Sequence, residues 1–183
     1  EDAILVGLIG RIDVAKGQDK FIESAKLICD KLEKPKLDKI KFFIVGSAEK
    51  GAGENYVLKL KNRTIELGIS DKVIFTGFRG DIPEIMQSID IAVFPSENEA
   101  FGLVVIEAMA SEKAVVGFRR GAFPEIIKDN ETGIMTDFNY QALAKGIYEL
   151  IIDDNKRQNF AKAGKKQVLE KFTLEQTLQK FLE

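Results

Sequence analysis

AILVGLIGRIDVAKGQDKFIESAKLICDKLE, residues 3–33, decides the fold class of this chain. Its first part, Ala3 to Ile9, is a continuous apolar run, which is typical of a strand buried on both faces. Gly10 to Gly17 forms a loop, and Asp19 to Glu33 carries its apolar residues on one helical face. A strand, a loop and a helix in this order predict one unit of a parallel sheet.

The same alternation continues along the chain. One helix is predicted at Glu54–Leu67 and ends at Gly68. A short helix is predicted to begin after Asp81, its N-cap, and another at Tyr140–Ile152. Further strands are predicted at Lys41–Val45, Lys72–Thr76, Asp90–Phe94, Lys113–Phe118 and Gly133–Met135. The pattern predicts an α/β fold, a three-layer α/β/α sandwich with a parallel six-stranded Rossmann-like sheet. Ligands of such sheets bind beyond the carboxyl ends of the strands, where the pattern places Arg11, Gly77, Glu99 and Gly121.

Composition narrows the function classes. The 183 residues, 45% of them hydrophobic and 31% charged, fit one domain with a single core. A net charge of −2 gives no reason to expect a nucleic acid as partner. No apolar run approaches the ~18 residues of a membrane span, and no signal peptide is visible at Glu1. With Cys29 as the single cysteine, we expect a cytoplasmic protein with an inert core thiol.

The chain contains no histidine. The most frequent general base, the most frequent zinc ligand and every Ser-His or Cys-His arrangement are therefore excluded within this chain. Its chemistry has to use carboxylates, lysine, arginine and the backbone, or residues supplied from elsewhere.

A second stretch, Phe94 to Ala110, reads FPSENEAFGLVVIEAMA and indicates a ligand site. Its helix is apolar almost all round, which predicts burial, and a buried Glu107 needs a charged or hydrogen-bonding partner. Glu99 stands just before the helix, where free amides and the dipole favour an anion. Together the carboxylates and amides predict a site for a ligand with hydroxyl and phosphate groups. In the structural alternative, Glu99 only favours the helix dipole, and Glu107 either sits at the rim of the helix or pairs with an Arg or Lys.

The loop after the first strand, GRIDVAKG, carries two cations. Arg11 follows the carboxyl end of the strand, and Lys16 stands at the start of the helix, where a cation opposes the helix dipole. An anion bound between them would explain their presence. The alternative is a pair of solvated loop charges.

Residues 94–110 resemble the signature of the retaining glycosyltransferase family 4: Glu99, seven residues and Glu107, with Phe-Gly-Leu after the first Glu and Ala-Met-Ala after the second. Members of that family use two Rossmann-like domains, the GT-B fold, and carry the signature in the C-terminal, donor-binding domain. The resemblance implies that Glu107 binds the nucleotide ribose and that Arg11 and Lys16 clamp the donor diphosphate. It also implies that Glu99 and the backbone after it hold the sugar and diphosphate, namely at Ala100, Phe101, Gly102 and Leu103.

Two other loops bear on the nucleotide. Residues 46–53, GSAEKGAG, nearly match a P-loop, but Ala52 stands where Walker A requires Lys, which excludes a kinase or ATPase of that kind. Gly46, which opens this loop, is counted with the donor-binding residues. Phe78 follows the third strand; the resemblance implies contact with the nucleobase, and a packing role is the alternative.

The chain departs from the family pattern around the fifth strand. The family usually has Gly and then Pro before the Val-Val pair, where this chain has Glu112 and Ala114. It usually has Gly-Gly before the Pro-Glu pair, where this chain has Gly121-Ala122. These departures leave both glutamates of the signature in place.

The resemblance implies a glycosyltransferase that moves a hexosyl group, with retention, from a nucleotide-diphosphate sugar to a glycan or lipid-linked glycan. Glu99, Arg11 and Lys16 are the catalytic candidates. Retention needs either a carboxylate nucleophile, for which Glu99 is the one carboxylate placed near the sugar, or front-face attack assisted by the departing phosphate. No metal or other cofactor is expected. Residues 1–183 correspond to the donor domain, so the N-terminal acceptor domain is absent from this chain and the fragment alone is expected to be inactive. The alternatives are a sugar-phosphate epimerase or phosphorylase of similar fold, and a nucleotide-sugar-binding module without catalysis.

Lys156 to Lys171 forms a basic helical segment, with Glu170 as its one acid. Such a segment can lie on an anionic membrane, so peripheral contact with the inner face of the cytoplasmic membrane is one interpretation. Its apolar residues, chiefly Phe160, Val168 and Phe172, are few for insertion, which favours a solvated face.

Overall fold

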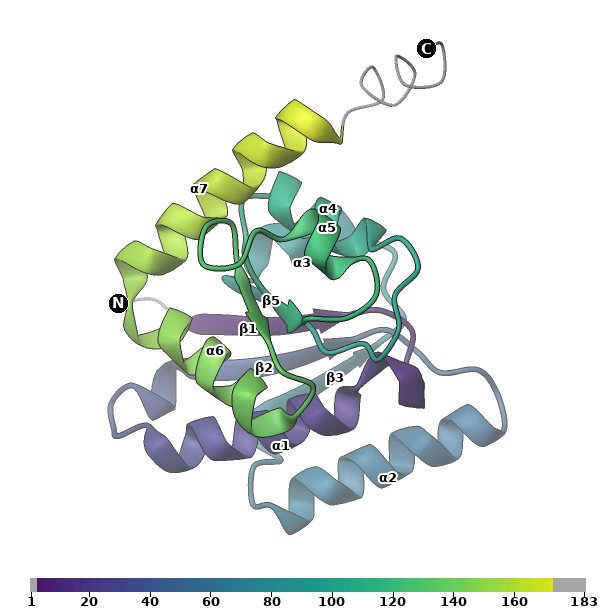
Figure 1. Cartoon of the computed structure of the whole chain (residues 1–183). Helices are drawn as coiled ribbons and strands as arrows, with labels where there is room; N and C mark the ends of the chain where they lie inside the picture. Colours follow the sequence, from purple (N-terminus) through teal and green to yellow (C-terminus); the bar gives the residue numbers. More distant parts are fainter. Residues whose placement is uncertain (1–2, 173–183) are drawn as a thin grey trace.

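The computed structural model describes residues 3–172 (Figure 1). Its strands are β1 Ile4–Ile9, β2 Ile40–Val45, β3 Val73–Gly77, β4 Ile91–Phe94, β5 Ala114–Phe118 and β6 Ile134–Thr136. Its α-helices are α1 Gln18–Lys31, α2 Ala52–Glu66, α3 Ile82–Ser88, α4 Leu103–Ala110, α5 Phe123–Ile126, α6 Tyr140–Ile152 and α7 Asp154–Lys171. The 3-10 turns η1 Val14–Lys16 and η2 Leu37–Lys39 precede α1 and β2.

The strands form one six-stranded sheet in the order β3-β2-β1-β4-β5-β6. Every neighbouring pair is parallel, and β1 pairs with β2 in continuous register from Ile4 opposite Ile40 to Ile9 opposite Val45. This is the strand order of the Rossmann fold, in which the chain reverses direction across the sheet between β1 and β4. The predicted fold class is confirmed.

Helices cover both faces of the sheet, as the three-layer prediction requires (Figure 1). One buried cluster joins the strands to α1, α2 and α6 through Phe21, Leu60 and Ile147. The second cluster joins the opposite faces of the strands to α3, α4 and α5 through residues such as Met86 and Val105. The strands are apolar on both faces because each face packs against helices.

Element bounds agree with the predicted ones to within a few residues. The main differences are that α1 ends at Lys31 and that α2 begins at Ala52. Gly68 follows α2 with a positive φ of 67°, as expected for a residue that ends a helix. Asp81 stands at the N-cap of α3, but its side chain binds the Arg79 guanidinium instead of the helix amides. The charge-assisted pair replaces the predicted cap.

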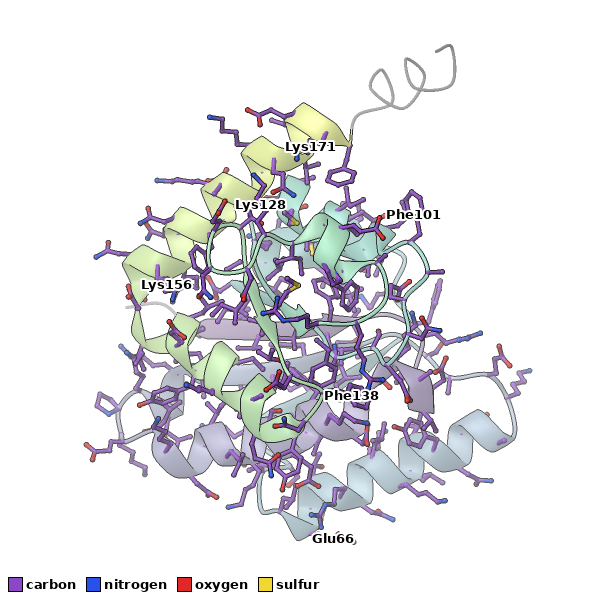
Figure 2. The ribbon with its side chains drawn as sticks, in the orientation of Figure 1. Glu66, Phe101, Lys128, Phe138, Lys156 and Lys171 are labelled. Atoms are coloured by element: carbon purple, nitrogen blue, oxygen red, sulfur yellow. The ribbon has the colours of Figure 1, made fainter. Side chains whose placement is uncertain are left out.

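Helix α7 packs against the domain through a few apolar side chains. Phe160 belongs to the first buried cluster and Val168 to the second, and Phe172 packs against the second. Lys156 and Lys171 lie near the two ends of this helix (Figure 2). Leu169 is 61% exposed, and the rest of the outer face is largely charged. Within residues 3–172, no helix is long and apolar enough to cross a membrane.

Cys29 lies on the buried face of α1, as predicted, and is 9% exposed. Removal from water disfavours the thiolate and is the main reason that the pKa of this thiol rises from 9.0 to about 11. The thiolate is the reactive form, so the fold suppresses the reactivity of Cys29.

We therefore predict that Cys29 is nearly silent toward Ellman's reagent at pH 8 in the folded protein. The rise in pKa alone lowers the thiolate fraction about 100-fold, and burial of the sulfur slows the reaction further. Native reactivity should increase as the pH approaches 11. Urea-unfolded protein is the control, and equal rates in the folded and unfolded samples would contradict the prediction.

Candidate functional site

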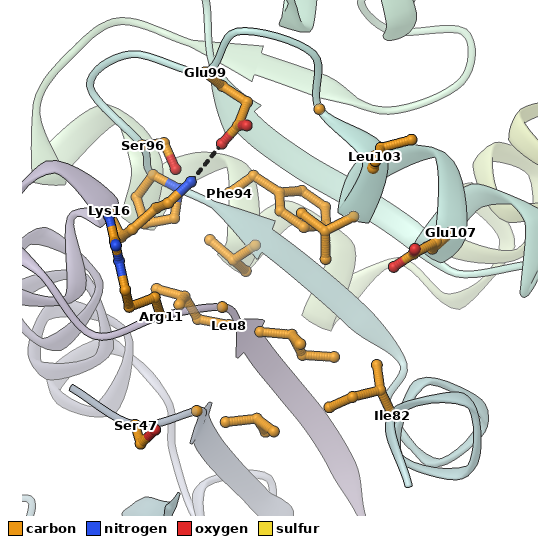
Figure 3. A pocket seen from close by; sticks show the side chains of 18 of the residues that line it. Leu8, Arg11, Lys16, Ser47, Ile82, Phe94, Ser96, Glu99, Leu103 and Glu107 are labelled. Atoms are coloured by element: carbon orange, nitrogen blue, oxygen red, sulfur yellow. Dashed lines mark hydrogen bonds and ion pairs between the residues drawn. The ribbon is translucent and has the colours of Figure 1, made fainter. Parts of the chain in front are cut away.

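A cavity of about 780 Å³ opens at the carboxyl ends of β1, β2 and β4 (Figure 3). Strand residues such as Leu8, Val45 and Val93 form an apolar floor, and the loops that follow the strands supply the polar side chains. The cavity lies where the strand order reverses, the usual ligand position in open α/β sheets. The structure thus places the candidate site at the edge of the sheet that the sequence predicted.

All the predicted donor-site residues line this one cavity except Ala100. The lining includes Arg11, Lys16, Gly46, Phe78, Glu99, Phe101, Gly102, Leu103 and Glu107. They come from four separate loops and the first turns of α4. The loops meet only in the folded sheet, since 96 positions separate Arg11 from Glu107 in the sequence.

The loops after β1 and β2 touch through their backbones. Gly10 N–H donates to Val45 C=O, and Ile12 N–H donates to Ser47 C=O, both at 2.9 Å. At Gly46, which has a φ of 142°, an added Cβ would lie 2.0 Å from the Gly10 carbonyl oxygen. Gly46 is therefore required by the approach of the two loops, a structural role in addition to its place on the cavity wall.

Lys16 and Glu99 form the central ion pair of the cavity. Lys16 Nζ lies 2.7 Å from Glu99 Oε2, and the two side chains are 29% and 18% exposed (Figure 3). The Glu99 carbonyl accepts a hydrogen bond from Ala122 N–H, and a Cβ on Gly121 would lie 2.5 Å from that carbonyl oxygen. The loop after β5 thus supports the backbone of Glu99 from outside the cavity.

Arg11 also has carboxylate partners. Its Nε donates to Asp13 at 2.9 Å, and its Nη1 donates to Glu49 at 3.0 Å. The sequence predicted an anion between Arg11 and Lys16, and in the structure protein carboxylates surround both cations. Lys16 is mostly buried in its ion pair and is not a solvated loop charge, whereas the Arg11 side chain is paired but 58% exposed.

Glu107 is exposed, although the sequence predicted a buried carboxylate. We expected a buried carboxylate with a charged or hydrogen-bonding partner, but Glu107 is exposed and faces the cavity. The helix is apolar all round for a different reason: one side packs through Val105 and Met109, while Leu103 on the other side is 60% exposed and forms cavity wall. An open apolar wall produces the same sequence pattern as a fully buried helix.

The N-terminus of α4 opens on the same cavity. Gly102 is its N-cap with a positive φ of 76°, and within residues 3–172 no side chain caps the first turn. An added Cβ on Gly102 would lie 2.7 Å from Ile126 Cδ1, so glycine is needed here for both reasons. Uncapped amides at a helix N-terminus are suited to an anion.

The exposure of Phe78 bears on one of its two alternatives. Its side chain is 80% exposed and lies on the cavity rim, so it is not a packing residue of this domain. Phe101, 65% exposed, is a second aromatic ring on the lining. Both rings are available to a ligand or to another protein surface.

Several lining residues were missed from the sequence. They are Ser47, Ala48, Glu49, Arg79, Ile82 and Ser96. All of them follow strands or begin helices at the carboxyl edge of the sheet, so the strand-end rule could have identified their loops. No sequence signal identified the pairing of Glu49 with Arg11, which are 38 positions apart.

The departures from the family pattern fall at opposite ends of β5. Glu112, with a φ of 59°, and Ala114 lie at its amino end, where Glu112 pairs with Lys165 of α7. That end is remote from the cavity. Gly121-Ala122 lies at the carboxyl end and contacts the backbone of Glu99, so only this departure adjoins the site.

The charged groups of the cavity are arginine, lysine and carboxylates. Within the described residues, no three His, Cys, Asp or Glu side chains come together as a group that could hold a metal ion. The cationic side chains on the lining are Arg11, Lys16 and Arg79, of which Arg79 is paired with Asp81; the amides at the start of α4 are also suited to an anionic ligand.

Comparison with known proteins gives a consistent picture. Residues 1–167 match the model of the family described as glycosyl transferases group 1. The chain is 33% identical over 151 residues to the lipopolysaccharide core biosynthesis mannosyltransferase LpcC of Rhizobium leguminosarum bv. viciae. That match covers 81% of this chain but 41% of the mannosyltransferase.

Two solved structures share the fold. Anabaena HepE in complex with UDP superposes with a TM-score of 0.89 at 28% identity, covering 99% of this chain and 48% of HepE. The C-terminal domain of a group 1 glycosyl transferase, LpcC from Francisella tularensis, superposes with a TM-score of 0.85 at 31% identity. This match covers 94% of this chain and 88% of that domain. This chain therefore spans less than half the length of the longer proteins it resembles.

Proposed function

This chain belongs to the glycosyl transferases group 1 family, and we propose that it holds the nucleotide-diphosphate sugar in a retaining, family 4 hexosyltransferase. The acceptor in this proposal is a glycan or a lipid-linked glycan. The observation that carries the proposal is the cavity itself, which brings the predicted cations Arg11 and Lys16, the predicted glutamates Glu99 and Glu107, and the open N-terminus of α4 to one place.

We propose further that the chain is the C-terminal half of a two-domain GT-B enzyme. Support comes from the match to an isolated C-terminal domain of a group 1 glycosyl transferase, of which this chain covers 88%. The acceptor would bind to an N-terminal half that this chain does not contain. Chemistry in the cleft between two halves needs both, so the chain alone should transfer no sugar.

Two exposed side chains on the cavity lining suit the nucleoside of the donor. Glu107 is exposed on the cavity wall, where a carboxylate can accept hydrogen bonds from ribose hydroxyls. Phe78 offers an exposed ring to the nucleobase. Structures of HepE with UDP and with UDP-glucose make uridine the first nucleoside to test.

Arg11 and Lys16 would stabilise the leaving group. In the proposed reaction the bond between the sugar C1 and the β-phosphate oxygen breaks, and its electron pair stays on the phosphate. The acceptor hydroxyl oxygen forms the new bond to C1 from the same face, and its proton passes to the departing phosphate. Two fixed cations facing that phosphate stabilise its growing charge without a divalent metal. Glu99, placed against Lys16, would orient the sugar.

We propose a cytoplasmic location, in keeping with a single, buried thiol. Peripheral contact with an anionic membrane would depend on the exposed charges of α7, because Phe160 and Val168 are buried in the core. Such contact would be electrostatic and sensitive to salt.

The first test of this function is calorimetry of the chain with UDP, GDP and ADP in the presence of EDTA. We predict binding of one nucleoside diphosphate without added metal, and a loss of about tenfold or more in Lys16→Ala, because a charge-assisted hydrogen bond contributes ~1.5–3 kcal/mol. Lys20→Ala is the matched control, since Lys20 pairs with Asp19 and packs over Phe138. Binding only with Mg²⁺, or equal effects of the two variants, would refute the prediction.

The second test separates the two glutamates in the complete two-domain enzyme. Glu99→Gln should lower turnover more than nucleotide affinity, and Glu107→Gln should first raise the nucleotide dissociation constant. NMR of the fresh product should show the anomeric configuration of the donor. The opposite anomer would exclude retention, and an exchange of the two phenotypes would reverse the roles assigned to Glu99 and Glu107.

A further inference from the structure

The Arg11–Glu49 ion pair stands between two cavities. Arg11 and Glu49 line both the main cavity and a neighbouring one of about 420 Å³, which also contacts Asp13, Val14 and Tyr56. Arg11 comes from the loop after β1, and Glu49 comes from the loop after β2. The pair links these two loops through their side chains.

The two carboxylates on Arg11 differ in how firmly they are held. Asp13 is fixed locally: its Oδ1 accepts from Ala15 N–H at 2.9 Å, and its Oδ2 accepts from Arg11. Glu49 is 78% exposed, and within residues 3–172 its side chain makes no hydrogen bond other than the one with Arg11. An exposed pair of this kind contributes little to stability, so Glu49 can leave at low cost.

The charges around Arg11 and Lys16 favour displacement of one carboxylate when a phosphate binds. Near the two cations stand three carboxylates, namely Asp13, Glu49 and Glu99. The formal charge around the cations is therefore negative before any ligand arrives. A diphosphate that reaches Arg11 either adds its charge to this surplus or displaces a carboxylate, and Glu49 is the one with the fewest contacts.

We propose that Glu49 is a specificity-determining residue that competes with ligand phosphate for Arg11. The proposal rests on the function given above, because it requires a phosphate group in this cavity. Displacement of Glu49 reduces the affinity for the free nucleoside diphosphate. After transfer, the return of Glu49 to Arg11 favours release of the diphosphate product. Ligands without phosphate do not meet this competition.

The test is a double-mutant cycle measured by calorimetry with the tightest-binding of UDP, GDP and ADP. Glu49→Gln should bind that nucleotide about two- to fivefold more tightly, which corresponds to the strength of an exposed ion pair. The gain in affinity should vanish when the Arg11→Ala variant is compared with the double variant Arg11→Ala/Glu49→Gln. The matching uncharged nucleoside should bind equally to the wild type and to Glu49→Gln.

Glu97→Gln is the control for simple removal of a nearby negative charge. Glu97 is exposed in the loop after β4, does not line the cavity, and its side chain has no partner within the described part of the chain. Its removal should change nucleotide affinity less than Glu49→Gln does. An equal gain in affinity from both variants would show that Glu49 acts only through its general negative charge, which would overturn the proposal.

The remaining outcomes separate the inference from the function. Nucleotide binding to the wild type with no gain in Glu49→Gln, or with the same gain in the Arg11→Ala background, overturns the inference and leaves the function standing. Binding by Glu49→Gln alone supports both. Absence of binding by every variant overturns both.

Discussion

The ion pair between Lys16 and Glu99 is the interaction on which the site depends. It joins the loop after β1 to the loop after β4, which are 83 positions apart but neighbours in the sheet. The strand order reverses at this point, so no crossover helix fills the space between the two loops. Both side chains are mostly buried, which shields their attraction from water and salt more than at an exposed surface.

Backbone contacts hold the same two loops together. Glu97 N–H donates to the Ala15 carbonyl at 2.8 Å, and a Cβ on Gly17 would lie 2.1 Å from the Pro95 carbonyl oxygen. The ion pair is therefore formed between backbones that are already fixed. The loops after β1 and β2 are also joined through their backbones, but the Arg11–Glu49 pair between them is exposed. Lys16 is firmly paired, whereas Glu49, one of the two carboxylate partners of Arg11, is exchangeable, which suits a site that has to bind and release a charged ligand.

The sequence predicted the fold well because its strands are continuous apolar runs and its helices have one apolar face. It also predicted which loops meet, since the strand-end rule depends only on topology. It did not predict side-chain pairs that depend on the exact geometry of the loops. Arg79 replaced the helix amides as the partner of Asp81, and Glu49 met Arg11 across 38 positions. Glu107 was misplaced because an apolar cavity wall and a buried face have the same residue pattern.

The central claim is that this cavity receives a nucleoside diphosphate through its two cations. The most direct measurement is a crystal structure of the chain with the nucleoside diphosphate that binds it most tightly. The account predicts phosphate oxygens within hydrogen-bonding distance of Lys16 and Arg11, and ribose hydroxyls beside Glu107. A diphosphate bound instead on the lysine-rich face of α7, with the cavity left to solvent, would contradict it.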